Sequence, residues 1–120
     1  MSQALKRGMV VLVDLNPTKG AETNKVRPCV IVTNDIYNAR VPVIQVVPIT
    51  AWSEKKARIR TNVVLQPTNE NGLSKVSVAD CLQTRPIDHR KRLIEVKGRL
   101  SPALMAEIDL ALEFVFDLGA

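Results

Sequence analysis

Arg27, which stands directly before an apolar run, is the residue of this sequence that most suggests chemistry. The segment NKVRPCVIVTND (residues 24–35) places Arg27 and Pro28 directly before Cys29–Thr33, which has the β-branched composition of a buried strand. A guanidinium at the start of a core strand needs a reason. Whether that reason is catalytic depends on which other reactive groups the sequence offers.

The inventory of reactive groups is small. The chain has one histidine, His89, and no His, Cys and Asp cluster at the spacing of a metal site. The glycine-rich nucleotide-binding motifs and the G-x-S-x-G motif of serine hydrolases do not occur either. A catalytic triad would have to recruit His89 from DHRKR (88–92), which is typical of a solvated turn. We therefore expect any enzyme here to work with no metal, no cofactor and no catalytic histidine.

RNA cleavage is one reaction that needs so few groups. Each RNA phosphodiester carries its own nucleophile, the neighbouring 2′-hydroxyl, so a protein has only to align it, move a proton and stabilise the phosphorane. Positioning and electrostatic stabilisation can supply most of that. An arginine beside a hydroxyl donor and a carboxylate would be sufficient.

The charge distribution fits an anionic partner. Residues 1–100 hold all 17 Lys and Arg with eight acids, a net charge of +9, whereas residues 101–120 hold four acids and no base. Such a cationic body favours nucleic acid, an acidic protein or another anionic surface, and a merely well-solvated basic surface is the alternative. Aromatic residues make up only 3% of the chain, which argues against a platform of stacking aromatics for single strands.

Residues 1–100 have the pattern of a small β protein. Short β-branched runs separated by turn residues suggest a barrel or sandwich, in a single domain spanning 1–120. The expected strands are Val10–Leu15, Cys29–Thr33, Val41–Thr50, Arg58–Gln66, Lys75–Gln83 and Leu93–Val96. Pro42 and Pro48 restrict the third strand to an edge of the sheet or to strand ends.

The segment SPALMAEIDLALEFVFDL (101–118) has a helical period instead. Ser101 is the expected N-cap and Pro102 the first helical residue. The residues expected to face the core are Leu104, Ile108, Ala111, Leu112 and Val115. An acidic ridge on another face, either solvated or in contact with a partner, consists of Asp109, Glu113 and Asp117.

The cysteines and the apolar runs bear on location. Cys29 and Cys81 lie in apolar stretches and are expected to be buried free thiols of a reducing compartment, although a disulfide stays open. Asp14 interrupts the first apolar run too early for a signal peptide, and no run approaches the roughly 20 apolar residues of a membrane span. We expect a cytoplasmic protein.

Two polar loops could carry function. The connection Pro17–Val26 is long for two consecutive strands, as functional loops often are. AWSEKKA (51–57) places Trp52 beside Lys55 and Lys56, so the indole could stack on a base or simply pack.

The ordered set of motifs resembles one protein family. RGMVVLVDLNPTKGAETNKVRPCVIVTND (7–35), VVPIT (46–50), GLSKVSVAD (72–80) and KGRLSPALMAEI (97–108) are similar to segments of the MazF/PemK (Kid) toxins, over essentially the whole chain. The resemblance implies a mainly β protein of the α+β class, an SH3-like small β-barrel with a C-terminal helix that acts as a homodimer. It also implies a cytoplasmic toxin of a type II toxin–antitoxin pair.

The resemblance further implies an activity and its partners. The toxin would be a sequence-specific, metal-independent endoribonuclease that cleaves single-stranded RNA and leaves a 2′,3′-cyclic phosphate and a 5′-hydroxyl. A cognate antitoxin protein would inhibit it, and operator DNA would be bound only through the antitoxin complex.

Three residues match catalytic positions of the family: Arg27 its arginine, Thr50 its threonine and Glu22 a first-loop acid. Pro28 would hold Arg27 in extended backbone at the rim of the barrel, facing a phosphate. Because a guanidinium with a pKa above about 12 is a poor base, we expect Arg27 to stabilise the phosphorane and Thr50 to donate a hydrogen bond. Glu22 would take the 2′-hydroxyl proton. Each also has a simpler explanation, namely an ion pair, a strand-end residue and a solvated acid.

The expected RNA-binding residues lie in the polar loops and in DCLQTRPID (80–88). They are Thr23, Lys25, Trp52, Lys55, Lys56, Asp80, Gln83 and Arg85. DCLQTRPID departs from the family's pattern in length, so the roles of its residues are ambiguous, and Asp80 could instead pair with Arg85 or Lys75. Ala21 replaces a serine or histidine of many relatives, which removes one polar contact.

Two non-catalytic functions remain alternatives. The chain could be a binding module like the gyrase poisons of the same fold, which a lack of RNA cleavage would favour. It could also be a nucleic-acid-binding repressor subunit, which steep salt dependence of DNA binding by the isolated protein would favour.

Overall fold

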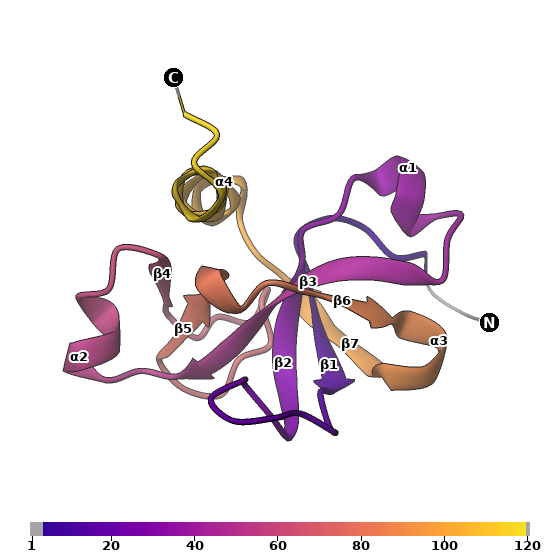
Figure 1. Ribbon diagram of the computed structural model, residues 1–120, viewed down its shortest axis with the longest axis horizontal. Helices are drawn as coiled ribbons and strands as arrows, with labels where there is room; N and C mark the ends of the chain where they lie inside the picture. The colour runs from indigo at the N-terminus through magenta and orange to yellow at the C-terminus, as the bar shows by residue number, and fades with distance from the viewer. Residues whose placement is uncertain (1–3, 120) are drawn as a thin grey trace.

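The computed structural model describes residues 4–119 (Figure 1). The fold is built on an antiparallel sheet with short helices between its strands and a longer helix at the C-terminus. The strands are β1 (Met9–Asp14), β2 (Val26–Ile31), β3 (Val43–Ala51), β4 (Asn62–Leu65), β5 (Ser77–Asp80), β6 (Arg85–Asp88) and β7 (Leu93–Arg99). They run in the order β4-β5-β3-β2-β1-β7, and β6 pairs with β3 off this path. The helices are α1 (Asp35–Asn38), α2 (Glu54–Ala57), α3 (His89–Arg92), α4 (Pro102–Phe116) and the 3₁₀ helix η1 (Cys81–Gln83).

The predicted mainly β architecture with a C-terminal helix is confirmed, although the sheet does not close into a hydrogen-bonded barrel. Within residues 4–119, β4, β6 and β7 each pair with one neighbour, so each has an open edge. In Figure 1, α4 lies over β4 and β5, whereas α1 and α3 lie toward the other end of the molecule, near β6.

β1 is buried on both faces, because its side chains alternate between two apolar clusters. Val10 packs in the cluster that includes Ile108 of α4, whereas Val11 and Val13 pack with Ile87 of β6 in the second cluster. This alternation is the period of two expected of a strand. The two clusters fix β1 and its neighbours β2 and β7, which support the site described below.

α4 follows the sequence prediction closely. The Ser101 hydroxyl accepts a hydrogen bond from the Leu104 N–H at 3.2 Å, and Pro102 occupies the first turn. Ile108 and Ala111 are buried, and Leu104, Leu112 and Val115 pack against the same cluster, so the predicted core-facing residues are confirmed. In the acidic ridge, Asp109 pairs with Arg7, whereas Glu113 and Asp117 are exposed.

The prediction that prolines confine the third strand to an edge or to strand ends holds for Pro42, which precedes β3, but is wrong for Pro48. β3 pairs with β2 on one side and with β6 and β5 on the other. Residues 43–46 pair with β6 and residues 49–51 with β5, so Pro48 lies in the gap between these two partners. A proline there removes no ladder hydrogen bond on that side, which is why a central strand tolerates it.

Other boundaries differ from the predictions for local reasons. The strand predicted at 58–66 begins at Asn62, because Ser53 caps the short helix α2 before it. The strand predicted at 75–83 ends at Asp80, where η1 begins. β6 was not predicted, because it contains Pro86 and proline is typical of turns. DHRKR contains the one-turn helix α3 rather than a turn. β2 starts earlier than predicted, at Val26, and includes Arg27.

The cysteines are buried free thiols, as predicted. Within residues 4–119, no helix is long and apolar enough to cross a membrane.

Candidate active site

A groove of about 330 Å³ contains the two residues with the strongest claim to chemistry, Arg27 and Thr50. Its other polar lining residues are Ser74, Lys75, Ser77 and Lys97. Its apolar lining residues are Leu12, Val26, Pro28, Ile49 and Leu73, with Ala51 and Gly72 completing the wall. The lining therefore has three cations and no acid. We call this hollow the basic groove.

Arg27 is partly buried near the start of β2. Its Nε donates to the Asn24 carbonyl at 2.8 Å, which fixes the guanidinium against the end of the first loop. Within residues 4–119, neither of its terminal nitrogens makes a further hydrogen bond, so both can bind an anion bidentately.

Thr50 lies on β3, and its hydroxyl is held by a lysine. Lys56 Nζ donates to Thr50 Oγ1 at 3.3 Å and to the Ala51 carbonyl at 3.2 Å. Lys56 is itself placed by the capping of α2, because the Ser53 hydroxyl accepts its N–H at 3.1 Å and Asn62 Nδ2 donates to its carbonyl at 3.0 Å. A hydroxyl that accepts from Lys56 still has its own O–H to donate.

Asp80 lies on the same side, close to Lys56. Burial raises the pKa of the Asp80 carboxyl above its usual range, against the opposing effects of the Gln83 N–H, the Lys56 charge and the Leu82 N–H. Within the described chain Asp80 forms no ion pair with Arg85 or Lys75. Lys56 therefore donates to Thr50 and acts on Asp80 only through its charge.

Glu22 lies in a neighbouring hollow of about 320 Å³ rather than in the basic groove, together with Thr23 and residues 82–86. Its Oε1 accepts the Lys19 N–H at 2.8 Å, within a turn of the first loop. The structure thus brings Arg27 and Thr50 together and places the third predicted catalytic residue apart from them.

Gln83 and Arg85, both predicted to bind RNA, hold the first loop through their side chains. Gln83 Oε1 accepts the Thr23 N–H and its Nε2 donates to the Ala21 carbonyl, each at 3.2 Å. Arg85 donates to the Leu15 carbonyl at 3.1 Å, at the end of β1. These contacts fix the loop from both sides.

The basic groove and the neighbouring hollow lie close together, as the buried thiol of Cys29 shows. Burial raises its pKa to about 12, and the charges of Arg85 and Arg27 act in the opposite direction. Both guanidinium groups are therefore near this thiol.

The remaining predicted RNA-binding residues surround the groove without lining it. Trp52 is 46% exposed just after β3, and Lys55 is exposed on α2. Lys25 is exposed at the end of the first loop, where its φ is 72° and its N–H donates to Asn16 Oδ1 at 3.1 Å.

Four groove residues were absent from the predicted set: Ser74, Lys75, Ser77 and Lys97. Lys75 and both serines lie in the motif GLSKVSVAD, which carried the family resemblance, so this motif could have pointed to them. Lys97 opens another of these motifs, KGRLSPALMAEI (97–108), but its place in the groove depends on the strand pairing.

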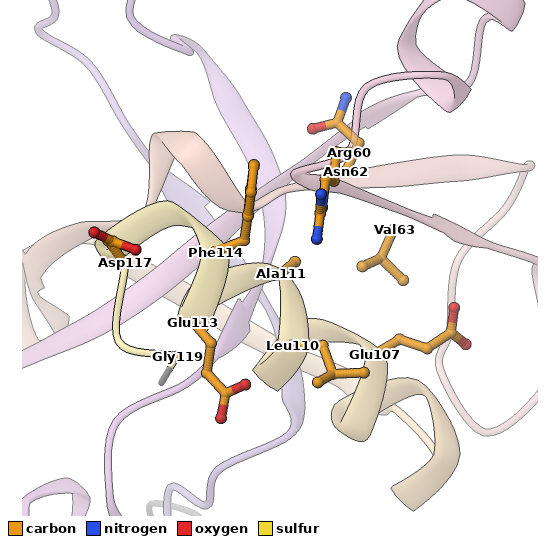
Figure 2. Close-up of a pocket in the computed structure, with 10 residues that line it drawn as sticks. All are labelled: Arg60, Asn62, Val63, Glu107, Leu110, Ala111, Glu113, Phe114, Asp117 and Gly119. Carbon is orange, nitrogen blue, oxygen red and sulfur yellow. The ribbon is translucent and has the colours of Figure 1, made fainter.

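A larger hollow beside α4, of about 470 Å³, has the opposite charge (Figure 2). Glu107, Glu113 and Asp117 line it with a single base, Arg60, whose guanidinium lies 3.9 Å from the centre of the Phe114 ring. An acidic lining repels a phosphodiester, so this hollow does not compete with the basic groove as an anion site. Among residues 4–119, no three His, Cys, Asp or Glu side chains are grouped to hold a metal ion.

The fold and the whole sequence define a family. The chain belongs to the PemK-like, MazF-like toxins of type II toxin–antitoxin systems, whose family model matches residues 6–116. It is 37% identical over 119 residues to Endoribonuclease MazF9 of Mycobacterium tuberculosis, covering 95% of this chain and 98% of that relative. It is 40% identical over 115 residues to Endoribonuclease MazF of Staphylococcus epidermidis, covering 96% and 93%.

Solved structures share the fold at lower identity. MazF from Deinococcus radiodurans superposes with a TM-score of 0.79 at 21% identity, covering 97% of this chain and 99% of that one. An endoribonuclease from mycobacterial species, solved in complex with its cognate antitoxin, has a TM-score of 0.77 at 23% identity and covers 98% and 99%.

Proposed function

We propose that this protein is a sequence-specific endoribonuclease toxin that cleaves single-stranded RNA in the basic groove. The observation that carries the proposal is the groove itself, where Arg27, Thr50 and two lysines face one cavity that no acid lines. Two relatives that match over nearly the whole chain are named endoribonucleases. The charge of the groove suits a polyanion, and its apolar wall offers surface to a ribose or a base.

The proposed chemistry uses the substrate's own nucleophile and no metal. The 2′-oxygen attacks the adjacent phosphorus and its proton passes to a base. The P–O5′ bond breaks and the departing O5′ takes a proton from water, leaving a 2′,3′-cyclic phosphate and a 5′-hydroxyl. Arg27 binds the non-bridging oxygens with its free nitrogens, and charge builds on those oxygens as the phosphorane forms. Thr50 donates its O–H to the same phosphate while Lys56 holds its oxygen.

Glu22 is proposed as the base that takes the 2′-proton. Its Oε1 is engaged by Lys19 N–H, so Oε2 is the oxygen available for proton transfer. Since Glu22 lies in the neighbouring hollow, the scissile nucleotide would have to reach across from the basic groove toward it. Full activity in Glu22→Gln would remove it from this role.

The test of the mechanism is a substrate without the nucleophile. An RNA that the wild type cleaves is resynthesised with a single 2′-deoxy nucleotide on the 5′ side of the cut. Cleavage should stop at that position only, and the unmodified RNA should yield a cyclic phosphate end in the presence of EDTA. Cleavage of the deoxy substrate would refute attack by the 2′-hydroxyl.

We further propose a cytoplasmic toxin with a cognate antitoxin as its partner. An acidic antitoxin segment that folds onto the basic groove would neutralise its three cations and cover Arg27. A mycobacterial neighbour of this fold has been solved with its cognate antitoxin, which supports the idea. Operator DNA would be bound only by the complex, so the isolated protein should not retard an operator fragment.

A homodimer is the proposed assembly. α4 leaves Leu110, Phe114 and Phe116 between 50% and 66% exposed, and exposed apolar surface of this kind is typical of an interaction site. Light scattering should give twice the 13.3 kDa chain mass, and Leu110→Glu should shift the mass toward the monomer. A monomeric wild type at micromolar concentration would contradict the proposal.

A further inference from the structure

Lys97 is the unpaired residue of a β-bulge at the basic groove. Val10 of β1 pairs with Gly98 of β7, but the next residue, Val11, pairs with Val96, so Lys97 has no partner on β1. A bulge re-aims a side chain and is common next to active sites. Here the re-aimed side chain lines the groove that contains Arg27 and Thr50.

A pair of glycines fixes Lys97 against the loop that carries Lys75. A Cβ on Gly98 would lie 2.1 Å from the Glu70 carbonyl oxygen, and a Cβ on Gly72, whose φ is +68°, would lie 2.3 Å from the Lys97 carbonyl oxygen. The Arg99 N–H also donates to the Glu70 carbonyl at 2.8 Å. Only glycine permits this contact of two backbones, and the contact brings Lys75 and Lys97 to one groove.

Neither lysine is neutralised by a strong ion pair. Within residues 4–119 Lys75 makes no salt bridge, and Lys97 Nζ reaches Glu95 Oε1 only at 3.5 Å, with both side chains well exposed. An exposed pair at that distance contributes little energy and yields readily to a stronger anion. Two free ammonium groups thus stand in the groove in addition to the guanidinium.

We propose that Lys75 and Lys97 form a second phosphate-binding subsite of the groove. This subsite holds a phosphate next to the one that Arg27 and Thr50 engage, so the RNA backbone crosses the groove between the two subsites. The inference rests on the proposed ribonuclease function and adds to it a pair of residues that bind substrate without taking part in the chemistry. Their role is affinity and register, because a lysine contacts phosphate as a point charge with no base selectivity.

The expected effect is on binding and its salt dependence. For single strands each phosphate contact adds roughly 0.7 to the slope of log K against log salt, so losing one contact weakens binding about fivefold at 0.1 M salt. Lys75→Met with Lys97→Met removes the single phosphate contact of the subsite, so it should raise the Kd about fivefold and lower the slope by about 0.7.

The experiment measures binding of a non-cleavable RNA, in which the nucleotide that supplies the 2′-oxygen carries a 2′-O-methyl group. Wild type, the double variant and Lys91→Met are titrated from 50 to 300 mM salt, and thermal melts confirm that each is folded. Lys91 is an exposed lysine on α3 that does not line the groove, so its variant controls for the loss of charge alone. RNAs with one methylphosphonate at each successive position then locate the phosphate involved.

The results separate the inference from the proposed function. The inference predicts that one methylphosphonate adjacent to the cut weakens RNA binding by the wild type and leaves binding by the double variant unaffected. It also predicts that the slope of log K against log salt for Lys91→Met stays within about 0.3 of the wild-type slope. An unchanged slope in the double variant, or an equal fall in Lys91→Met, overturns the inference while the ribonuclease proposal stands. A wild type that neither binds nor cuts RNA overturns both.

Discussion

Replacing Gly98 with alanine tests how the groove is assembled. The added Cβ would lie 2.1 Å from the Glu70 carbonyl oxygen and 2.7 Å from the Asn71 carbonyl carbon, and both are backbone atoms that cannot rotate away. Overpacking of this kind costs about 1–3 kcal/mol. The hydrogen bond from Arg99 N–H to the same carbonyl, 2.8 Å long, would be lost as the loop moves, for about 1 kcal/mol more.

The total of roughly 2–4 kcal/mol converts to a melting shift. For 120 residues the entropy of unfolding is about 0.25 kcal/mol/K, so we expect Tm to fall by about 8–16 °C. Gly119→Ala is the matched control, because no atom lies within 4 Å of the position of its Cβ. RNA binding should weaken as well, since the displaced loop carries Lys75 away from the groove. A Gly98→Ala protein that melts within 2 °C of the wild type would refute the backbone contact.

Three further variants or treatments probe the site. Lys56→Met should lower the single-turnover cleavage rate about tenfold by releasing the Thr50 hydroxyl. Lys55→Met removes the same charge from an exposed position on α2 and should leave that rate nearly unchanged. Equal effects of the two changes would contradict the positioning role of Lys56. Because burial raises the pKa of Asp80, the folded state favours its protonated form, so ionisation of Asp80 costs stability as pH rises from its ordinary 3.8 through the raised value. Urea unfolding should therefore show that the free energy of unfolding of Asp80→Asn, relative to that of the wild type, is higher at pH 7 than at pH 4. The native protein should react with iodoacetamide at pH 8 far more slowly than the urea-unfolded chain, since burial raises the pKa of the Cys29 thiol to about 12; equal rates would show that the thiol is open to solvent.

Periodicity alone predicted the elements whose pattern is local. The cap at Ser101 and the apolar stripe of α4 depend on residues three or four apart, and β1 depends on a simple β-branched run. β6 and the central position of β3 in the sheet were not predicted, for one physical reason. A proline is compatible with a strand wherever its missing N–H faces no partner, and the position of partners is a property of the whole sheet.

Some features of the candidate site could likewise be predicted from the sequence, whereas others depend on the folded sheet. Arg27 and Thr50 were paired through the family's motifs, and the structure places them in one groove. Gln83 and Arg85 were predicted to bind RNA, and the structure shows that their side chains also hold the backbone of the first loop and of Leu15, a contact that no spacing along the chain reveals. Lys97 depends on a register shift between two strands, so only the paired sheet could show that it faces the groove.

The most direct test of the central claim is cleavage of labelled single-stranded RNA in EDTA by the purified wild type and by Arg27→Ala, with DNA of matching sequence as the control. Arg27→Lys is included because it keeps the charge but loses the bidentate geometry, so it should retain partial activity. The account predicts metal-free cuts in RNA alone, lost in Arg27→Ala. Undiminished cleavage by Arg27→Ala, or no cleavage of any RNA by folded wild type free of antitoxin, would contradict it.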